Sequence, residues 1–341
     1  MHILVTGGAG YIGSHVVKQI LENTNYKVTI IDNLSGGKCD TISILSSLIT
    51  DEERFNFYKE DLSNFYAIEQ IVKNNKFDAV IHLSASIVVP ESVTNPMKYY
   101  MNNTVNTAHL ISLCDKYEVN KFVFSSTAAV YGEPLEISIT ELTETNPVNP
   151  YGMSKLMSEK VLIDLAKAKD SFKYVIFRYF NVAGADLETR LGECHEPETH
   201  LIPLIIHAAI GKRDSIYMYG DDYDTKDGSC IRDYVHVDDL ANAHIKALSY
   251  LQEGEKSNIF NCGYGHGFSV REVIDTVKKI SSIDFKVEIA KRRDGDPAQL
   301  IADNSKIVKE MEWQPKYDDL ELICKTALAW EKKSKFKGND H

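Results

Sequence analysis

The sequence has no long hydrophobic run. A helix that spans a membrane needs about 18 consecutive apolar residues, and no segment of the 341 residues approaches that length. The N-terminal residues also lack the basic region, apolar stretch and cleavage site of a signal peptide. Repeats and low-complexity tracts are absent from the sequence as well. We therefore expect a soluble, folded protein of the cytoplasm, with no membrane partner.

Cysteine is scarce and shows no pattern. The six cysteines contain no C-x-x-C pair and no spacing typical of a zinc site or a disulfide framework, so we expect buried thiols in a reducing compartment. One stretch, GECHEPETH, brings Cys194, His195 and His200 close together. These are metal-ligating residue types, but we interpret the stretch as a loop and predict no metal.

Positive charge is in deficit. The chain has 38 lysines and arginines against 49 aspartates and glutamates, which gives a formal net charge of -11. Nucleic acid would be repelled at long range, so we do not expect it as a partner. An anionic small molecule would need local basic groups, and Arg232 and the run 291–293 could supply them. Isolated arginines are also common on solvated surfaces.

Short β-branched and aromatic runs recur through the first half of the chain. They occupy residues 2–6, 27–32, 55–62, 77–85, 121–127 and 174–180, with longer mixed segments between them. This alternation is typical of a parallel sheet with helices on both faces. We predict an α/β fold: a doubly wound Rossmann-type domain at 1–180 and a smaller mixed α/β substrate lobe at 181–341. Segments of the lobe can interleave with the first domain.

The stretch VTGGAGYIGSH follows the first predicted strand. Gly7, Gly10 and Gly13 let the backbone turn tightly and approach a pyrophosphate, which the N-terminus of the next helix favours. Asp32 ends the second strand, where a carboxylate accepts hydrogen bonds from ribose hydroxyls and repels a 2′-phosphate. Asp61 and Leu62, after the third run, suit the adenine edge. This pattern predicts bound NAD rather than NADP.

Two tyrosines stand four residues before a lysine. Tyr117 precedes a predicted strand that begins at Lys121, so that pair should not share a face. Tyr151 and Lys155 lie near the start of an amphipathic helix, where an ammonium one turn away can stabilise a phenolate. Thr127 ends a strand at the carboxyl edge of the sheet, the usual place for an active site in this fold.

Further motifs extend over nearly the whole chain: PESV, FSSTAAVYGEP, NPYGMSKLMSE, RYFNVAGA, DGSCIRDYVHVDDLA and RRDGDP. With Asn102, Thr127, Tyr151 and Lys155, they resemble the extended short-chain dehydrogenase/reductase family, and most closely its UDP-galactose 4-epimerases. The resemblance implies transient oxidation at C4 of a UDP-hexose by tightly bound NAD, with Tyr151 as the base.

The resemblance also implies the residues of each site. Cofactor contacts are expected from Gly7, Gly10, Tyr11, Ile12, Gly13, Asp32, Asn33, Asp61, Leu62, Asn102, Tyr151 and Lys155. Substrate contacts are expected from Thr127, Tyr151, Asn181, His200, Leu201, Tyr219, Arg232, Arg293, Asp296 and Leu300. Guanidinium groups suit a diphosphate, an aromatic ring suits uracil, and a carboxylate suits ribose hydroxyls.

The sequence departs from the family pattern at three positions. Ile87 replaces a lysine that lies near the cofactor diphosphate in many relatives, and His200 replaces a substrate-facing asparagine. Leu300 stands where relatives restricted to UDP-glucose and UDP-galactose have a tyrosine that crowds the sugar 2-position. We therefore predict that the UDP-N-acetylhexosamines are also accepted, unless Leu300 merely packs, because one steric change is often worth only about 1 to 3 kcal/mol.

Other functions of the same fold stay open. A related reductase or decarboxylase would use the same NAD site, and an NAD-binding regulator would need no catalysis. A 4,6-dehydratase is not expected, because Ala128 and Ala129 stand where those enzymes have an Asp-Glu pair. The resemblance further implies a homodimer, formed by helices within 93–116 and 151–169.

Overall fold

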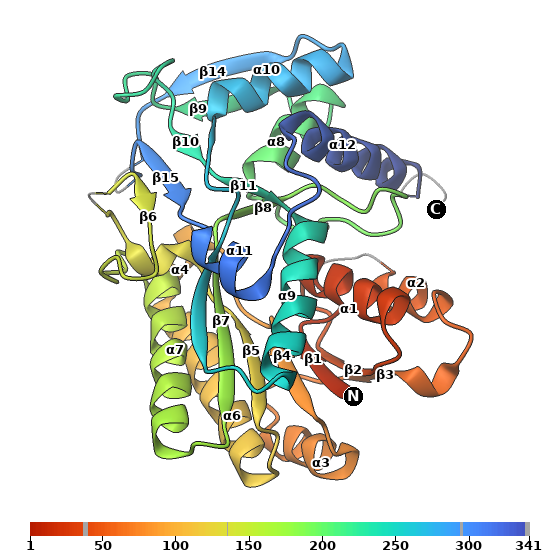
Figure 1. Cartoon of the computed structure of the whole chain (residues 1–341). Helices are drawn as coiled ribbons and strands as arrows, with labels where there is room; N and C mark the ends of the chain where they lie inside the picture. Colours follow the sequence, from red (N-terminus) through yellow and green to blue (C-terminus); the bar gives the residue numbers. More distant parts are fainter. Residues whose placement is uncertain (37–39, 135, 294–295, 338–341) are drawn as a thin grey trace.

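A parallel sheet of seven strands forms the larger part of the molecule (Figure 1). The computed structural model describes residues 1–36, 40–134, 136–293 and 296–337. In sheet order the strands are β12 (Asn258–Cys262), β7 (Lys173–Tyr179), β5 (Lys121–Ser125), β4 (Ala79–His82), β1 (His2–Thr6), β2 (Lys27–Asp32) and β3 (Phe55–Lys59). From β1 the chain adds β2 and β3 on one side of the sheet, and then β4, β5, β7 and β12 on the other side. The predicted doubly wound α/β fold is therefore confirmed.

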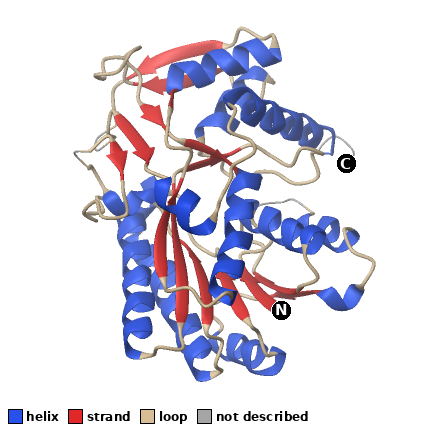
Figure 2. Cartoon of the chain, in the orientation of Figure 1, coloured by secondary structure: helices blue, strands red, loops and turns tan. Residues whose placement is uncertain are grey.

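Helices cover both faces of this sheet (Figure 2). One face carries α1 (Tyr11–Asn23), α2 (Thr41–Ser47) and α9 (Val237–Gln252), and the other carries α3 (Phe65–Asn75), α6 (Asn106–Lys116) and α7 (Pro150–Ala168). Neighbouring residues of a strand point to opposite faces. Ile3 and Val5 accordingly join the first hydrophobic cluster, and Leu4 joins the second. This burial on both faces explains why central strands such as β1 and β4 are almost continuously apolar.

A smaller lobe lies beyond the carboxyl ends of the strands (Figure 1). Its four-stranded sheet contains β13 (Phe268–Ser269), β10 (Ile231–Arg232), β15 (Gln299–Ala302) and β6 (Ser138–Ile139). Two parallel pairs add β11 (Tyr234–His236) with β8 (Asn181–Ala183), and β14 (Lys286–Ala290) with β9 (Ser215–Tyr219). The helices are α8 (Leu201–Ala209), α10 (Val270–Ser281), α11 (Ser305–Met311) and α12 (Leu320–Lys337). Because β10 pairs antiparallel with β13 and parallel with β15, the lobe is mixed, as predicted.

The two parts exchange segments. Strand β12 and helix α9 follow residue 180 yet pack in the larger part, whereas β6 precedes it and pairs with β15 in the lobe. One hydrophobic cluster contains Val5 and Ile20 of the larger part together with Val273 and Ile323 of the lobe. The division at residue 180 stays a prediction, and the chain shows the interleaving expected with it.

The segment between β4 and α6 is built from short helical pieces. It contains α4 (Val89–Thr94), α5 (Pro96–Tyr99) and a π-helical turn at Tyr100–Val105. Two 3₁₀ turns lie elsewhere, at Glu52–Arg54 and Ala128–Tyr131. Within the described parts of the chain, no helix is both long and apolar enough to cross a membrane.

The cysteines follow the prediction with one exception. Four of them are free and buried: Cys114, Cys230, Cys262 and Cys324. Cys194 takes part in a disulfide, so the expectation of a thiol is wrong at that position. Cys39 lies outside the described residues.

Candidate active site

The glycine-rich loop after β1 is packed too closely for side chains. Gly7 has φ +72, and a Cβ added there would lie 2.7 Å from the backbone nitrogen of Ser84. A Cβ at Gly13 would lie 2.0 Å from the carbonyl oxygen of Gly7. These two glycines therefore let the turn fold back against the start of α1, and the backbone is left bare where a pyrophosphate would approach.

Helix α1 begins at this loop without a side-chain cap. Gly10 occupies the N-cap position, and no side chain accepts from the first-turn N–H groups there. The Tyr11 hydroxyl donates a hydrogen bond of 2.6 Å to the carbonyl oxygen of Gly184, so its ring points toward the lobe. The uncapped first turn, with Tyr11 and Ile12 leading it, fits the diphosphate of NAD.

The ends of β2 and β3 bring the predicted adenosine-binding residues together. The Asp32 carboxylate accepts hydrogen bonds from the backbone N–H of Ala9 at 3.0 Å and of Leu34 at 2.8 Å. Burial raises the pKa of Asp32, and these hydrogen bonds oppose that shift. The Asn33 amide donates to Asp61 at 2.6 Å. The Leu62 side chain is buried in the core, so a cofactor contact there would come from the backbone.

Helix α7 presents the predicted catalytic pair. It starts where the Asn149 side chain accepts from the Gly152 N–H at 2.9 Å, and Pro150 occupies its first turn. Tyr151 and Lys155 follow one turn apart, and both are buried. Lys155 Nζ donates to the carbonyl oxygen of Ser125 at the end of β5, at 2.7 Å.

The other tyrosine and lysine of the same spacing are separated as expected. Tyr117 lies at the C-terminal end of α6, and Lys121 is the first residue of β5. The Tyr117 hydroxyl donates to Glu69 of α3 at 2.8 Å. The pair therefore shares no helical face, and the prediction that it does no chemistry has a clear structural basis.

Burial shifts the titration of the catalytic side chains. Burial lowers the pKa of Lys155 to about 7, and the charge of Glu159 partly opposes this shift. Burial also raises the pKa of Tyr151, whereas a hydrogen bond with Thr127 lowers it. Thr127 itself lies just after β5, where its hydroxyl accepts from the Ala129 N–H at 3.1 Å. Near neutral pH, Lys155 can therefore change its charge, whereas burial keeps the Tyr151 phenol protonated.

A buried ionic network lies one turn behind Lys155, and the sequence reasoning missed it. Glu159 accepts two hydrogen bonds from Arg178 of β7, at 3.1 and 2.6 Å, and one from the Ser126 hydroxyl at 2.5 Å. Arg178 also donates to the Tyr131 hydroxyl at 3.1 Å. The network fixes Ser126, which immediately precedes Thr127. An arginine inside an otherwise apolar strand, YVIFRYF, was the available signal.

Asn102 lies in the π-helical turn and is held by side chains of the loop after β4. Its amide donates to the Ser86 hydroxyl at 3.2 Å and to Asn103 at 3.1 Å. Asn103 is buried and also donates to Ser154 of α7, at 3.0 Å. The turn therefore connects the loop after β4 to the helix that carries the tyrosine, which agrees with the tendency of π-helical turns to occur at functional sites.

The predicted nucleotide-binding residues of the substrate gather in the lobe, where they pair with one another. Arg232 of β10 forms an ion pair with Asp296. The Arg293 guanidinium lies over the Tyr219 ring, 4.0 Å from its centroid. Asn181 of β8 donates to the carbonyl oxygen of Asp233 at 3.1 Å. Asp294 and Gly295 of the RRDGDP motif lie outside the described residues.

Leu300 lies between the predicted nucleotide-binding residues of the lobe and the predicted catalytic residues. It lies on β15, where its backbone is in register with Arg232 of β10. Its side chain packs against a small cluster that includes Ala128 and Phe180. Ala128 directly follows Thr127, so Leu300 lies between the strand that carries a nucleotide-binding arginine and the turn that follows the catalytic hydroxyl.

His200 and Leu201 begin helix α8. His200 is its N-cap residue, and the imidazole contacts the buried carboxylate of Glu193. Burial lowers the pKa of His200, but Glu193 more than compensates and raises it to about 8. The imidazole is thus held by a carboxylate of the same loop, a contact that the sequence reasoning did not anticipate. A direct contact of His200 or Leu201 with substrate stays a prediction.

The comparisons with known proteins agree with this arrangement. Residues 3–263 match the model of the NAD dependent epimerase/dehydratase family. The chain belongs to this family. A UDP-glucose 4-epimerase from Azospirillum brasilense is 45% identical over 97% of this chain and 92% of its own length. NAD is accordingly the cofactor, and the glycine loop and Asp32 fit it.

Solved structures extend the similarity over the same length. The UDP-Glc/GlcNAc 4-epimerase from Campylobacter jejuni is 55% identical, with a TM-score of 0.86 over 97% of this chain and 99% of that one. UDP-glucose 4-epimerase from Brucella ovis, solved in complex with NAD, is 39% identical, with a TM-score of 0.90 over 96% and 97%. Family membership and fold therefore rest on whole-chain similarity rather than on the glycine loop alone.

Proposed function

We infer that the chain is a UDP-sugar 4-epimerase that interconverts UDP-glucose and UDP-galactose. The observation that carries this inference is the placement of Tyr151 and Lys155, buried one turn apart on α7, beside Thr127 and the end of β5. A buried tyrosine near a lysine that can change its charge at neutral pH suits proton transfer to and from a sugar hydroxyl. The 4-epimerase relatives support the same assignment.

In the proposed reaction, Tyr151 takes the proton of the sugar 4-hydroxyl. Thr127 bridges this hydroxyl and the phenol, and the ammonium of Lys155 stabilises the phenolate. Bound NAD supplies a reversible hydride acceptor for C4. The 4-keto sugar then turns over within the site, and Tyr151 returns the proton after C4 is reduced on its other face. The reaction causes no net oxidation.

Arg232 and Arg293 hold the diphosphate in this proposal, Tyr219 flanks the uracil, and Asp296 accepts the uridine ribose hydroxyls. In the structure these groups pair among themselves. In this proposal, phosphate oxygens take the place of Asp296 at Arg232, and uracil takes the place of Arg293 at Tyr219.

We also propose that UDP-N-acetylglucosamine and UDP-N-acetylgalactosamine are substrates. Leu300 is only partly buried and packs beside Ala128 and Phe180, so it presents an aliphatic side chain without a hydroxyl next to the catalytic turn. This shape leaves room for a 2-acetamido group. The Campylobacter jejuni relative that acts on both UDP-Glc and UDP-GlcNAc supports this proposal.

Proton NMR of the purified protein with UDP-glucose or UDP-N-acetylglucosamine, without added cofactor, tests both statements. We expect both anomeric signals to convert to those of the galacto epimers. Conversion of UDP-glucose alone would refute the acetylated substrates and leave the epimerase assignment intact. If neither signal changes even after NAD is supplied, the epimerase assignment is wrong.

The substitution Leu300→Tyr tests whether Leu300 is what allows the acetylated sugars to bind. A tyrosine ring fills the space beside the sugar 2-position, so turnover of the acetylated sugars should fall at least about tenfold more than that of UDP-glucose. The ratio of the two kcat/KM values, measured by the same NMR assay, gives the result. Equal losses for both sugar classes would show that Leu300 acts through packing alone.

We propose in addition a homodimer in the cytoplasm. Four exposed apolar side chains follow one another at intervals of four residues along the segment before α6, and a fifth lies on α7; they are Val93, Met97, Met101, Val105 and Met157. Exposed apolar stripes of this kind mark protein interfaces. A second copy of the chain would cover the stripe, and sedimentation at micromolar concentration distinguishes a dimer from a monomer.

A further inference from the structure

Four potential metal ligands converge in the loop between β8 and α8. They are Glu193, His195, Glu198 and His200, and one ligand atom from each lies within 4.8 Å of the others. The four side chains come from eight consecutive residues of the sequence GECHEPETH. From the sequence, only the cysteine and the histidines of this stretch were weighed as ligands, and no metal was predicted; the proposal below departs from that prediction. Cys194 is disulfide-bonded and is not a ligand, whereas two glutamates complete the set.

Both imidazoles direct the same kind of nitrogen at one carboxylate oxygen. His195 Nδ1 lies 3.0 Å from Glu193 Oε1, and His200 Nδ1 contacts the same oxygen. His195 Nδ1 is buried, and apart from this contact with Glu193 it has no partner among the described residues. Buried polar atoms are rarely left in this state. A cation between the imidazole and the carboxylate would satisfy this nitrogen.

The donor set selects the class of ion. Two imidazole nitrogens and two carboxylate oxygens suit a four-coordinate Zn²⁺, or another divalent transition metal, whereas Mg²⁺ and Ca²⁺ prefer oxygen donors only. We propose that Glu193, His195, Glu198 and His200 bind one divalent transition-metal ion, with Zn²⁺ as the best match. The four ligands are not among the groups proposed for proton transfer, so the metal proposal does not depend on the proposed function, although His200 is also one of the residues predicted to contact substrate.

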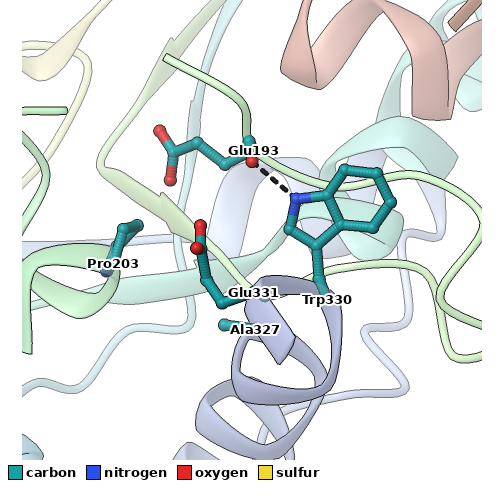
Figure 3. Close-up of a pocket in the computed structure, with 6 residues that line it drawn as sticks. Glu193, Pro203, Ala327, Trp330 and Glu331 are labelled. Carbon is teal, nitrogen blue, oxygen red and sulfur yellow. Dashed lines mark hydrogen bonds between the residues drawn. The ribbon is translucent and has the colours of Figure 1, made fainter. Parts of the chain in front are cut away.

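Neighbouring groups hold the proposed ligands in place. Trp330 Nε1 of α12 donates to the carbonyl oxygen of Glu193 at 2.6 Å (Figure 3). The Glu193 side chain is only 5% exposed and borders a small cavity of about 10 Å³. Glu198 Oε1 accepts from the backbone N–H groups of Thr199 and His200, at 2.7 and 2.8 Å, which orients its carboxylate. Such supporting hydrogen bonds are typical of built metal sites.

The ion would have a structural role. It would join the middle of the loop to His200, the N-cap residue of α8, and so fix the segment from which the helix starts. In that arrangement the His200 imidazole is a ligand, and the contribution of this segment to substrate binding comes through its position. The competing explanation is a metal-free pair of histidines hydrogen-bonded to Glu193.

Metal content and zinc titration of the full-length protein separate these explanations. The protein, purified without an affinity tag and with its NAD, is dialysed against a chelator and then titrated calorimetrically with Zn²⁺. We expect one high-affinity Zn²⁺ per chain, a rise in melting temperature on saturation, and a Co²⁺ absorption spectrum typical of four-coordinate nitrogen and oxygen ligands. The absence of saturable binding in the wild-type protein would overturn the proposal.

Two variants assign the binding to this cluster. His195→Gln removes one ligand and should weaken Zn²⁺ binding by at least about tenfold. The matched control is His266→Gln, which removes another histidine paired with a carboxylate, Asp318, on the surface. It should leave the titration unchanged. Unchanged affinity in His195→Gln would place the ion elsewhere and refute the site. If that variant fails to fold, Glu198→Gln, which removes another of the four ligands, provides the same test.

Discussion

The proposed catalytic residues at the carboxyl edge of the large sheet (Thr127, Tyr151 and Lys155; the catalytic edge) and the proposed nucleotide-recognition groups of the lobe are organised differently. At the edge, Tyr151 and Lys155 are 8% and 3% exposed, and hydrogen bonds hold the lysine and the turn around Thr127 in place. In the lobe, Tyr219 is 37% exposed with the Arg293 guanidinium over its ring, and Arg232 pairs with Asp296. The proposed catalytic side chains are thus held in a buried core, whereas the proposed recognition groups are more exposed and pair with one another.

The comparison predicts that Tyr151→Phe has the largest effect. Removal of the phenolic hydroxyl eliminates proton transfer while the ring still packs, so kcat for epimerisation should fall about a thousandfold with little change in KM. Steady-state conversion followed by NMR gives both constants. Tyr117→Phe is the matched control, because Tyr117 also precedes a lysine by four residues, and it should leave kcat unchanged. A large loss in the control would show that the assay reports folding.

The substitution Glu159→Gln tests whether the buried network supports Lys155. It leaves Arg178 buried without its anionic partner, so the free energy of unfolding should fall by about 3 kcal/mol. Because the charge of Glu159 raises the pKa of Lys155, that pKa should also fall further below about 7, and the pH profile of kcat should shift to lower pH.

Urea denaturation and the pH profile measure these two effects. The control is Asp164→Asn on the same helix, which removes an exposed partner of Lys167 and should change neither quantity. A loss of stability without a shift of the pH profile would make Glu159 structural only.

The substitution Arg232→Lys should have the smallest effect and should act on binding. A lysine keeps the charge but loses the forked donors, so KM for UDP-glucose should rise about tenfold while kcat changes little. Initial rates and calorimetric titration with UDP provide the values. Arg292→Lys is the control, because Arg292 is exposed and pairs with Asp222. A fall in kcat larger than the rise in KM would contradict the account. It would mean that Arg232 in the lobe affects catalysis at Tyr151 and Lys155 as well as substrate binding.

Local sequence patterns predicted the strands and helices that position the proposed catalytic residues. The glycine loop, the strand ends at Asp32 and Ser125, and the helix that carries Tyr151 all depend on neighbours within a few residues, so periodicity and capping indicate them. All six predicted runs coincide with strands of the large sheet. The distinction between the two tyrosine–lysine pairs also followed from local structure alone.

The lobe was less predictable because its structure depends on distant partners. Strands such as β6 and β10 contain two residues each, which is too few for a recognisable period. The Arg232–Asp296 pair of the lobe spans 64 residues. In the larger part, the pair of Glu159 on α7 and Arg178 on β7 spans 19 residues and was missed for the same reason. Likewise, the convergence of Glu193 with two histidines needed the fold of the loop. Side chains paired across such separations leave no spacing signal in a single sequence.

The fate of the hydrogen at C4 tests the central claim most directly. UDP-glucose that carries deuterium at C4 of the sugar is converted in ordinary water, and the deuterium content of UDP-galactose is measured by mass spectrometry. Transient oxidation with return of the same hydride predicts that the product retains the deuterium and gains no hydrogen from solvent. Replacement of the deuterium by solvent hydrogen would contradict the account.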